Sequence, residues 1–215
     1  MTALVGPSGS GKSTVAKLIA GYWDVTSGSI TLGGHELKDI PLSEIADQIS
    51  YVSQDDYLFN RSIRENIRMG SPSATDAEVE QAAKQSGCDA FIRKLDNGYD
   101  TVVAAPVPIF PAVNASGLPS PAPMLKDAPI IILDEATSSV DTRTEVRIQK
   151  AMDNLMKGRT SFVIAHRLST IKDADLILVM KDGDIIEQGN HEELLAKKGF
   201  YADLYNSQFE NKATA

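Results

Sequence analysis

The stretch GPSGSGKS, from Gly6 to Ser13, decides the fold of this chain. It fits the pattern G-x-x-x-x-G-K-[ST], in which glycines let backbone N–H groups wrap around phosphate oxygens. The preceding TALV is short and apolar, which predicts a strand, and the following TVAKLIAGYW places Val15, Leu18 and Ile19 on one helical face. The sequence therefore predicts a strand, a phosphate-binding loop and a helix whose N-terminus adds its dipole to the site.

Two residues of the loop have specific roles in this pattern. Lys12 reaches the β and γ phosphates of a bound nucleotide, and Ser13 ligates magnesium. The expected nucleotide-binding residues are Gly6, Pro7, Ser8, Gly9, Ser10, Gly11, Lys12, Ser13 and Thr14.

A pair of acids supplies the second half of the predicted site. In PIIILDEATS four apolar residues precede Asp134 and Glu135, a pattern typical of a strand buried on both faces of a parallel sheet. The acids then lie at the carboxyl end of the strand, where open α/β sheets bind ligands. We expect Asp134 to hold Mg²⁺ and Glu135 to polarise the attacking water.

Shorter patterns indicate the elements around this site. ISYVSQ and TSFVIAH are typical of strands that close at the polar residues Gln54 and His166. Thr75 with Glu78 three residues later predicts a helix that begins with a capping box. ADLILVMKDGDIIEQG predicts a hairpin that turns at Asp182–Gly183.

Composition excludes several classes of protein. The chain has 215 residues and a formal net charge of -8, and it has no basic run, which argues against a nucleic-acid partner. Its single cysteine, Cys88, cannot form an intramolecular disulfide. No apolar run approaches the roughly 18 residues that span a bilayer, so we expect any link to a membrane to come through a partner.

With these motifs together, the chain resembles the ATP-binding cassette domains of ABC transporters, especially those of exporters. YVSQDDYLFNRSIRENI resembles the family's Q-loop region, which makes Gln54 the glutamine that senses Mg²⁺ and the attacking water. SSVD, residues 138–141, resembles the loop that communicates across a dimer. His166 in VIAHRLST resembles the histidine that contacts the γ-phosphate.

The resemblance implies a fold, cofactors and partners. The fold is α/β, a P-loop NTPase with a mostly parallel sheet flanked by helices, and a helical subdomain at about 56–126 within one ATP-binding domain of residues 1–215. The cofactors are ATP and Mg²⁺, with Ser13, Gln54 and Asp134 near the metal. The partners are transmembrane domains, fused upstream or separate, and a second ATP-binding domain in a head-to-tail dimer, which places the chain at the cytoplasmic face of the membrane.

The chain departs from the family pattern in two places. The family begins with an antiparallel sheet and an adenine-stacking aromatic upstream of the phosphate loop, so we expect this chain to be a fragment that lacks most of that sheet. The family signature LSGGQ and the helix behind it are also absent, and residues 104–123 read AAPVPIFPAVNASGLPSPAP instead. Pro119, Pro121 and Pro123 would each cost about 3 kcal/mol in a helix interior, so we expect no helix there.

The genetic code suggests an origin for this aberrant segment. Codons can be chosen that encode Ile109 to Pro123 as they stand. When the same bases are read in the frame that starts at the last base of the Ile109 codon, they translate as LSGGQRQRIAIARA. Our hypothesis is that one base is lost near Val103 and one is gained near Met124. The alternative is a real, disordered insertion of Pro, Ala and Ser.

Two functions from different classes follow. The first is an ATPase that powers an ABC exporter, and the second is a nucleotide-binding but hydrolysis-incompetent cassette that acts as a partner or regulatory module. Soluble relatives in DNA repair or translation are a third interpretation, against which the exporter-like Q-loop and the acidic charge argue.

Overall fold

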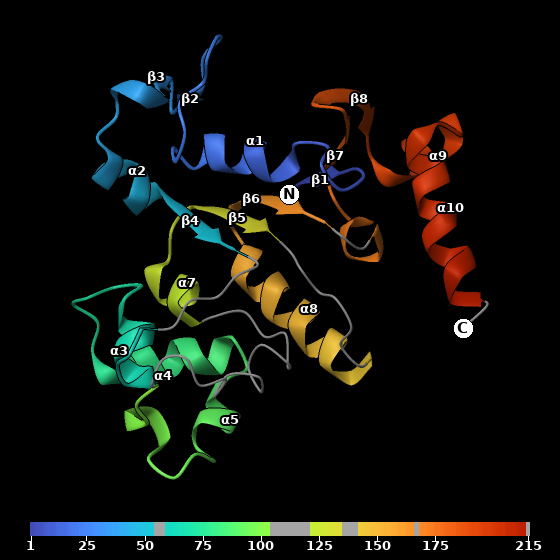
Figure 1. Cartoon of the computed structure of the whole chain (residues 1–215). Helices are drawn as coiled ribbons and strands as arrows, with labels where there is room; N and C mark the ends of the chain where they lie inside the picture. Colours follow the sequence, from blue (N-terminus) through green and yellow to red (C-terminus); the bar gives the residue numbers. More distant parts are fainter. Residues whose placement is uncertain (54–58, 104–120, 135–141, 166–167, 214–215) are drawn as a thin grey trace. The chain divides into compact units, whose positions relative to one another are not determined.

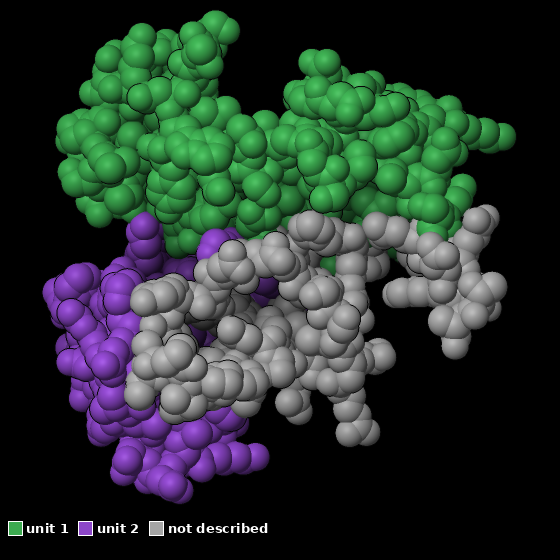
Figure 2. Space-filling view, in the orientation of Figure 1, with its two compact units in different colours: residues 1–51, 130–136, 160–215 green, residues 52–129, 137–159 purple. Residues whose placement is uncertain are grey.

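The structure is a computed structural model, and it describes residues 1–53, 59–103, 121–134, 142–165 and 168–213 (Figure 1). The chain forms two compact units, coloured green and purple in Figure 2. Unit 1 contains Met1–Tyr51, Ile130–Ala136 and Thr160–Ala215, and unit 2 contains Val52–Pro129 and Thr137–Arg159.

A six-stranded sheet forms the centre of unit 1, in the order β4-β5-β6-β1-β7-β8 (Figure 1). The pairs β1–β6, β1–β7 and β5–β6 are parallel, and β8 is antiparallel to β7. This arrangement confirms the predicted α/β fold with a mostly parallel sheet. The strands are β1 (Thr2–Val5), β4 (Ile49–Val52), β5 (Ile130–Asp134), β6 (Thr160–Ile164), β7 (Leu176–Lys181) and β8 (Asp184–Gly189).

The register of the sheet brings the predicted motifs to one edge. Asp134 lies opposite Ile164 of β6, and Ile164 lies opposite Leu4 of β1. Adjacent strands are about 4.8 Å apart, so Asp134 lies two strands, or about 10 Å, from the chain that leads into the Gly6–Ser13 loop. The sequence pattern of β5 is confirmed, because Ile131, Ile132 and Leu133 are at most 2% exposed.

Helices of unit 1 cover the sheet with apolar faces. One core cluster joins two helices to β1, β5, β6 and β7. It contains Ala16 of α1 (Lys12–Ile19), Ala20 at the C-cap of that helix, and Ile45 of α2 (Leu42–Gln48). A small antiparallel sheet joins these two helices in sequence. It consists of β2 (Thr31–Leu32) and β3 (His35–Glu36), and the 3-10 helix η1 (Leu37–Asp39) follows it.

The C-terminal part of unit 1 begins with the predicted hairpin. Asp182 and Gly183 have φ values of 51° and 92°, as the turn of a tight hairpin requires, and β7 pairs with β8 around them. The carboxylate of Glu187, which lies on β8, accepts hydrogen bonds from the backbone N–H groups of Phe200 and Tyr201, at 2.7 and 3.0 Å. The other elements here are the 3-10 helix η3 (Leu168–Ile171), α9 (His191–Lys197) and α10 (Phe200–Ala213).

Unit 2 is helical in its described part. Its elements are α3 (Ile63–Arg68), α4 (Asp76–Gln85), α5 (Asp89–Ile92), the 3-10 helix η2 (Gly98–Asp100), α7 (Pro121–Lys126) and α8 (Thr142–Met156). The capping box of Thr75 and Glu78 at the start of α4 is confirmed. Four of these α-helices and the 3-10 helix η2 lie within residues 56–126, and the bounds of a helical subdomain there stay a prediction.

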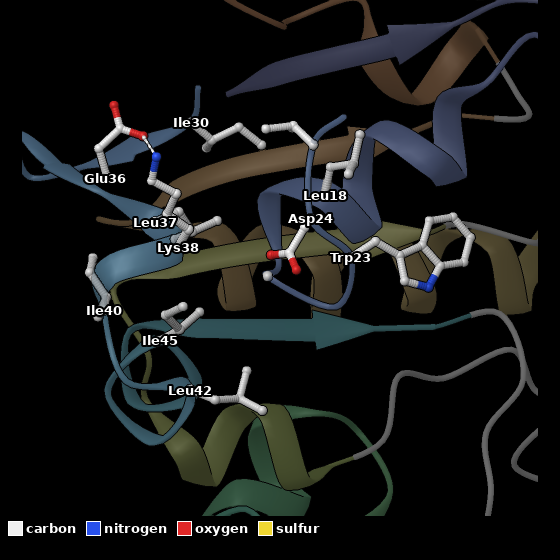
Figure 3. A pocket seen from close by; sticks show the side chains of 12 residues that line it. Leu18, Trp23, Asp24, Ile30, Glu36, Leu37, Lys38, Ile40, Leu42 and Ile45 are labelled. Atoms are coloured by element: carbon white, nitrogen blue, oxygen red, sulfur yellow. Dashed lines mark ion pairs between the residues drawn. The ribbon is translucent and has the colours of Figure 1, made fainter. Parts of the chain in front are cut away.

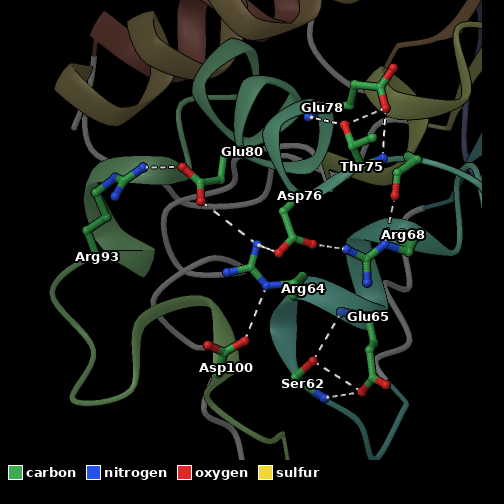
Figure 4. A network of polar contacts seen from close by, with 11 residues as sticks. Ser62, Arg64, Glu65, Arg68, Thr75, Asp76, Glu78, Glu80, Arg93 and Asp100 are labelled. Atoms are coloured by element: carbon green, nitrogen blue, oxygen red, sulfur yellow. Dashed lines mark hydrogen bonds and ion pairs between the residues drawn. The ribbon is translucent and has the colours of Figure 1, made fainter.

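Charged side chains connect the helices of unit 2 (Figure 4). Arg64 of α3 lies 3.3 Å from the Asp76 carboxylate of α4 and 3.2 Å from that of Asp100 in η2. The Arg64 and Arg93 guanidinium groups both lie over the buried Tyr99 ring, at 5.2 and 5.7 Å from its centroid. The partly exposed ion pairs contribute about 1 kcal/mol or less each, so the apolar cluster under them provides most of the stability.

The expectation that prolines exclude a helix is wrong for residues 121–126. Pro121 is the first residue of α7 and Pro123 is the third. The first N–H groups of a helix have no intrahelical partner, so proline loses no hydrogen bond at these positions. The rest of the segment, residues 104–120 with Pro119, lies outside the described residues.

Gly70 allows the end of α3 to approach α7 closely. A Cβ atom at this position would lie 2.1 Å from the carbonyl oxygen of Ala122, which is a backbone atom and cannot rotate away. We expect Gly70→Ala to lower the free energy of unfolding by about 2–3 kcal/mol, measured by urea denaturation.

Gly98→Ala is the matched control for this prediction. A Cβ atom at Gly98 would meet nothing within 4 Å, and its φ of 50° alone costs about 1 kcal/mol. Equal losses in the two variants would contradict the packing argument.

Candidate functional site

The loop between β1 and α1 is shaped by close backbone contact. Gly6 has a φ of 153°, and a Cβ atom there would lie 2.1 Å from the carbonyl oxygen of Met180 at the end of β7. Gly11, with a φ of 96°, is the N-cap of α1. Only glycine adopts both conformations without strain, so these two positions of the motif fix the path of the loop.

The N-terminus of α1 has no side-chain cap. Gly11 makes no capping hydrogen bond, and the first turn of α1 contains no acid. In contrast, α3, α4 and α9 each begin with a capping box. The N-cap residue there is Ser, Thr or Asn, and it and a Glu three residues later accept hydrogen bonds from backbone N–H groups at the helix start. The free N–H groups and the positive end of the α1 dipole therefore suit an anion.

Lys12 places a buried ammonium group in this loop. Its Nζ donates hydrogen bonds to the carbonyl oxygens of Gly6 and Pro7, at 3.0 and 2.9 Å, and to Ser10 Oγ at 3.3 Å. Burial lowers the pKa of Lys12, and the negative charge of Asp134 opposes this shift. That electrostatic influence links the phosphate loop to the carboxylate at the end of β5.

Asp134 has one bonded and one unbonded carboxylate oxygen. Its Oδ2 accepts a hydrogen bond of 2.9 Å from the Tyr51 hydroxyl of β4. Its Oδ1 is buried and has no hydrogen-bond partner among the described residues. A buried carboxylate oxygen without a partner costs free energy, so its presence points to a ligand that binds there.

These residues fit a magnesium ion that is shared with a nucleotide. Mg²⁺ takes oxygen ligands and is usually held by one or two protein groups with phosphates and waters. Asp134 Oδ1 and the exposed hydroxyl of Ser13 are donors of this kind. In the described part of the chain no three His, Cys, Asp or Glu side chains gather as a metal cluster.

Comparisons with known proteins agree with this geometry. The family described as "ABC transporter" matches residues 1–102. The "Uncharacterized ABC transporter ATP-binding protein YknV" of Bacillus subtilis strain 168 is 48% identical over 96% of this chain and 34% of its own length. An "ATP-dependent lipid A-core flippase" of Desulfotalea psychrophila is 47% identical over 96% of this chain and 36% of its own length.

A solved structure described as "Structure of a bacterial Atm1-family ABC exporter with ATP bound" matches with a TM-score of 0.84. It is 37% identical, over 96% of this chain and 36% of that chain. The chain belongs to the ATP-binding cassette family of ABC transporters. The cassette is thus of the ATPase class, and it spans about a third of the length of the curated relatives that it matches.

The structure describes only part of the predicted site of the cassette. All nine predicted nucleotide-binding residues lie in the loop and the first turn of α1, with Lys12 and Ser10 buried and Ser13 and Thr14 exposed. Asp134 lies at the end of β5, as predicted. The structure does not describe Gln54, Glu135, His166 or residues 138–141. Their predicted roles stay predictions.

Sequence reasoning missed two contributors to the site of the cassette. Tyr51 bonds to Asp134, and the Met180 carbonyl packs against Gly6. Neither has a local signal in the sequence, because each depends on which strands are neighbours in the sheet.

A separate hollow of about 200 Å³ lies elsewhere in unit 1 (Figure 3). It is lined by the apolar side chains of Leu18, Trp23, Ile30, Leu42 and others, with the Glu36–Lys38 ion pair beside them. None of the predicted nucleotide-binding residues lines it. As for a membrane, none of the helices in the described ranges has both the length and the apolar character that crossing a bilayer requires.

Proposed function

We propose that this cassette binds ATP together with Mg²⁺ and hydrolyses it to power an ABC exporter. The observation that supports the proposal most strongly is the uncapped start of α1, whose first residue, Lys12, is buried. At the same edge of the sheet lies Asp134 Oδ1, which has no hydrogen-bond partner among the described residues. The positive end of the α1 dipole and the Lys12 ammonium group suit phosphate oxygens, and the nearby carboxylate suits their metal ion.

Different residues of the chain bind the phosphates and the metal. The amides of the Gly6–Ser13 loop and Lys12 hold the phosphate oxygens, and Ser13 and Asp134 hold the metal shell. Magnesium, when bound, would neutralise charge on the β and γ phosphates. The geometry of Lys12 supports this role, because its three donors already point to oxygens of the loop where phosphate oxygens would compete.

For hydrolysis we propose roles that follow the family resemblance. Glu135 polarises the attacking water, and Gln54 and His166 complete the surroundings of the γ-phosphate. In the sequence, Glu135 directly follows β5, and Gln54 and His166 come two positions after the ends of β4 and β6.

The partners follow from the relatives. The matched proteins are about three times as long as this chain, and their printed names describe a flippase and an exporter with ATP bound. We propose that the cassette works with transmembrane domains, fused upstream or separate, and with a second ATP-binding domain in a head-to-tail dimer. This places it at the cytoplasmic face of the membrane, where it drives export of a substrate that the transmembrane domains select.

A specific observation favours a second function, a nucleotide-binding cassette that does not hydrolyse ATP. The family match ends at Val102, and the run that begins at Ala104 has no LSGGQ. Pro111 has no N–H group and Val113 carries a β-branched side chain, so FPAVN cannot present the amides that would bind the γ-phosphate of a partner.

Titration calorimetry of the 215-residue chain with ATP tests the shared part of both functions. We expect binding in the micromolar range with Mg²⁺, and weaker binding in EDTA. No binding at millimolar ATP would contradict both functions.

Turnover and nucleotide-dependent dimerisation then separate the two. Hydrolysis that disappears in Glu135→Gln supports the ATPase, and binding with turnover no higher than in Glu135→Gln supports the incompetent cassette.

A further inference from the structure

The hydroxyl group of Tyr51 is a direct partner of Asp134. Tyr51 lies on β4, the strand next to β5, and donates its hydrogen bond to Asp134 Oδ2 at 2.9 Å. The Tyr22 ring contacts the Tyr51 ring, with the centroids 5.5 Å apart. Tyr22 comes shortly after α1, so the ring of Tyr51 is held between β5 and the chain that follows the phosphate-binding helix.

The two oxygens of Asp134 are therefore not equivalent. One accepts a hydrogen bond from the neutral Tyr51 hydroxyl, and the other is buried and has no hydrogen-bond partner among the described residues. A hydrogen bond to one oxygen of a carboxylate limits its rotation, so the free oxygen keeps one direction.

We propose that Tyr51 is a positioning residue that orients Asp134 toward the magnesium ion of the bound nucleotide. The inference rests on the proposed function, because it gives Asp134 a metal to face. Groups that orient a metal-binding carboxylate typically change metal affinity by about 10–100-fold when they are removed. A hydrogen bond that only joins β4 to β5 would change stability without changing metal affinity.

Tyr51→Phe removes only the hydroxyl group and keeps the ring against Tyr22. The matched control is Tyr22→Phe, which makes the same chemical change in the ring that contacts Tyr51. In each variant and in the wild-type chain, calorimetry gives the affinity for a non-hydrolysable ATP analogue in EDTA. Electron paramagnetic resonance then gives the affinity for Mn²⁺, a stand-in for Mg²⁺, with the analogue saturating.

We expect Tyr51→Phe to weaken Mn²⁺ binding by about tenfold, the low end of the range for groups that orient a metal-binding carboxylate, and to leave the metal-free affinity within about twofold of wild type. Tyr22→Phe is expected to change neither value by more than about twofold. Mn²⁺ affinity within twofold of wild type in Tyr51→Phe, or an equal loss of metal-free affinity, overturns the positioning role while the proposed function stands. A wild-type chain that binds no analogue overturns both.

Discussion

We expect Lys12→Ala to weaken ATP binding by roughly 10- to 100-fold. Lys12 is 6% exposed, and its ammonium group is the positive charge that the structure places inside the phosphate loop. A hydrogen bond to a charged partner contributes about 1.5–3 kcal/mol, and each 1.4 kcal/mol is a tenfold change in affinity. Calorimetry with Mg²⁺-ATP measures the loss directly.

Lys17→Ala is the matched control for this variant. Lys17 lies on the same helix, carries the same charge and stacks over the Trp23 ring at 5.0 Å, away from the loop. We expect its ATP affinity to stay within about twofold of wild type. Since Lys12 also bonds three oxygens of its own loop, circular dichroism at each ATP concentration checks that Lys12→Ala remains folded. A folded variant with wild-type affinity would remove Lys12 from the proposed site.

Local patterns in the sequence predicted the elements of the fold that have strong physical causes. Four apolar residues before Asp134 indicated a strand buried on both faces, and β5 is buried as expected. The glycine spacing from Gly6 to Gly11 indicated a loop that leads into a helix, and the left-handed φ at Gly11 shows why glycine is needed there.

Other features depend on strand order, which no local pattern encodes. The bond between Tyr51 and Asp134 joins residues 83 positions apart, and it forms because β4 and β5 are neighbours in the sheet. Proline propensity misled the prediction at Pro121 and Pro123, because propensity penalties apply to a helix interior and α7 begins at these residues.

The largest gain in activity is expected from a repair of the aberrant segment. Replacing residues 110–123 by LSGGQRQRIAIARA is expected to raise ATP turnover by at least about 100-fold. The replacement supplies serine and glycine amides that can reach the γ-phosphate of a partner cassette, and stabilising groups that act in trans on this phosphate are worth about 10³–10⁵ in rate. Turnover is measured as phosphate release by the unchanged chain and by the chain with the replacement, at equal concentration.

A second replacement separates the signature from the helix behind it. FPAVQRQRIAIARA at residues 110–123 keeps Phe110–Val113 and changes only the residues that follow. If the phosphate-binding amides cause the gain, this control has the low turnover of the written chain. If both replacements raise turnover equally, helix repair alone is the cause, and the inference about the amides is wrong.

The origin of the segment is decided at the gene, across the codons for Asp100 to Asp127. The frame-slip hypothesis expects one missing base near Val103 and one extra base near Met124, whose correction yields LSGGQRQRIAIARA. In that case the natural protein has LSGGQRQRIAIARA at residues 110–123, and we expect its turnover to be that of an exporter ATPase. If the written bases stand and the repair still raises turnover, the gene encodes a cassette that has lost the half of the site that faces its partner. ATP hydrolysis in such a dimer then requires a second cassette with an intact signature, because only that partner can complete the site at Lys12 and Asp134.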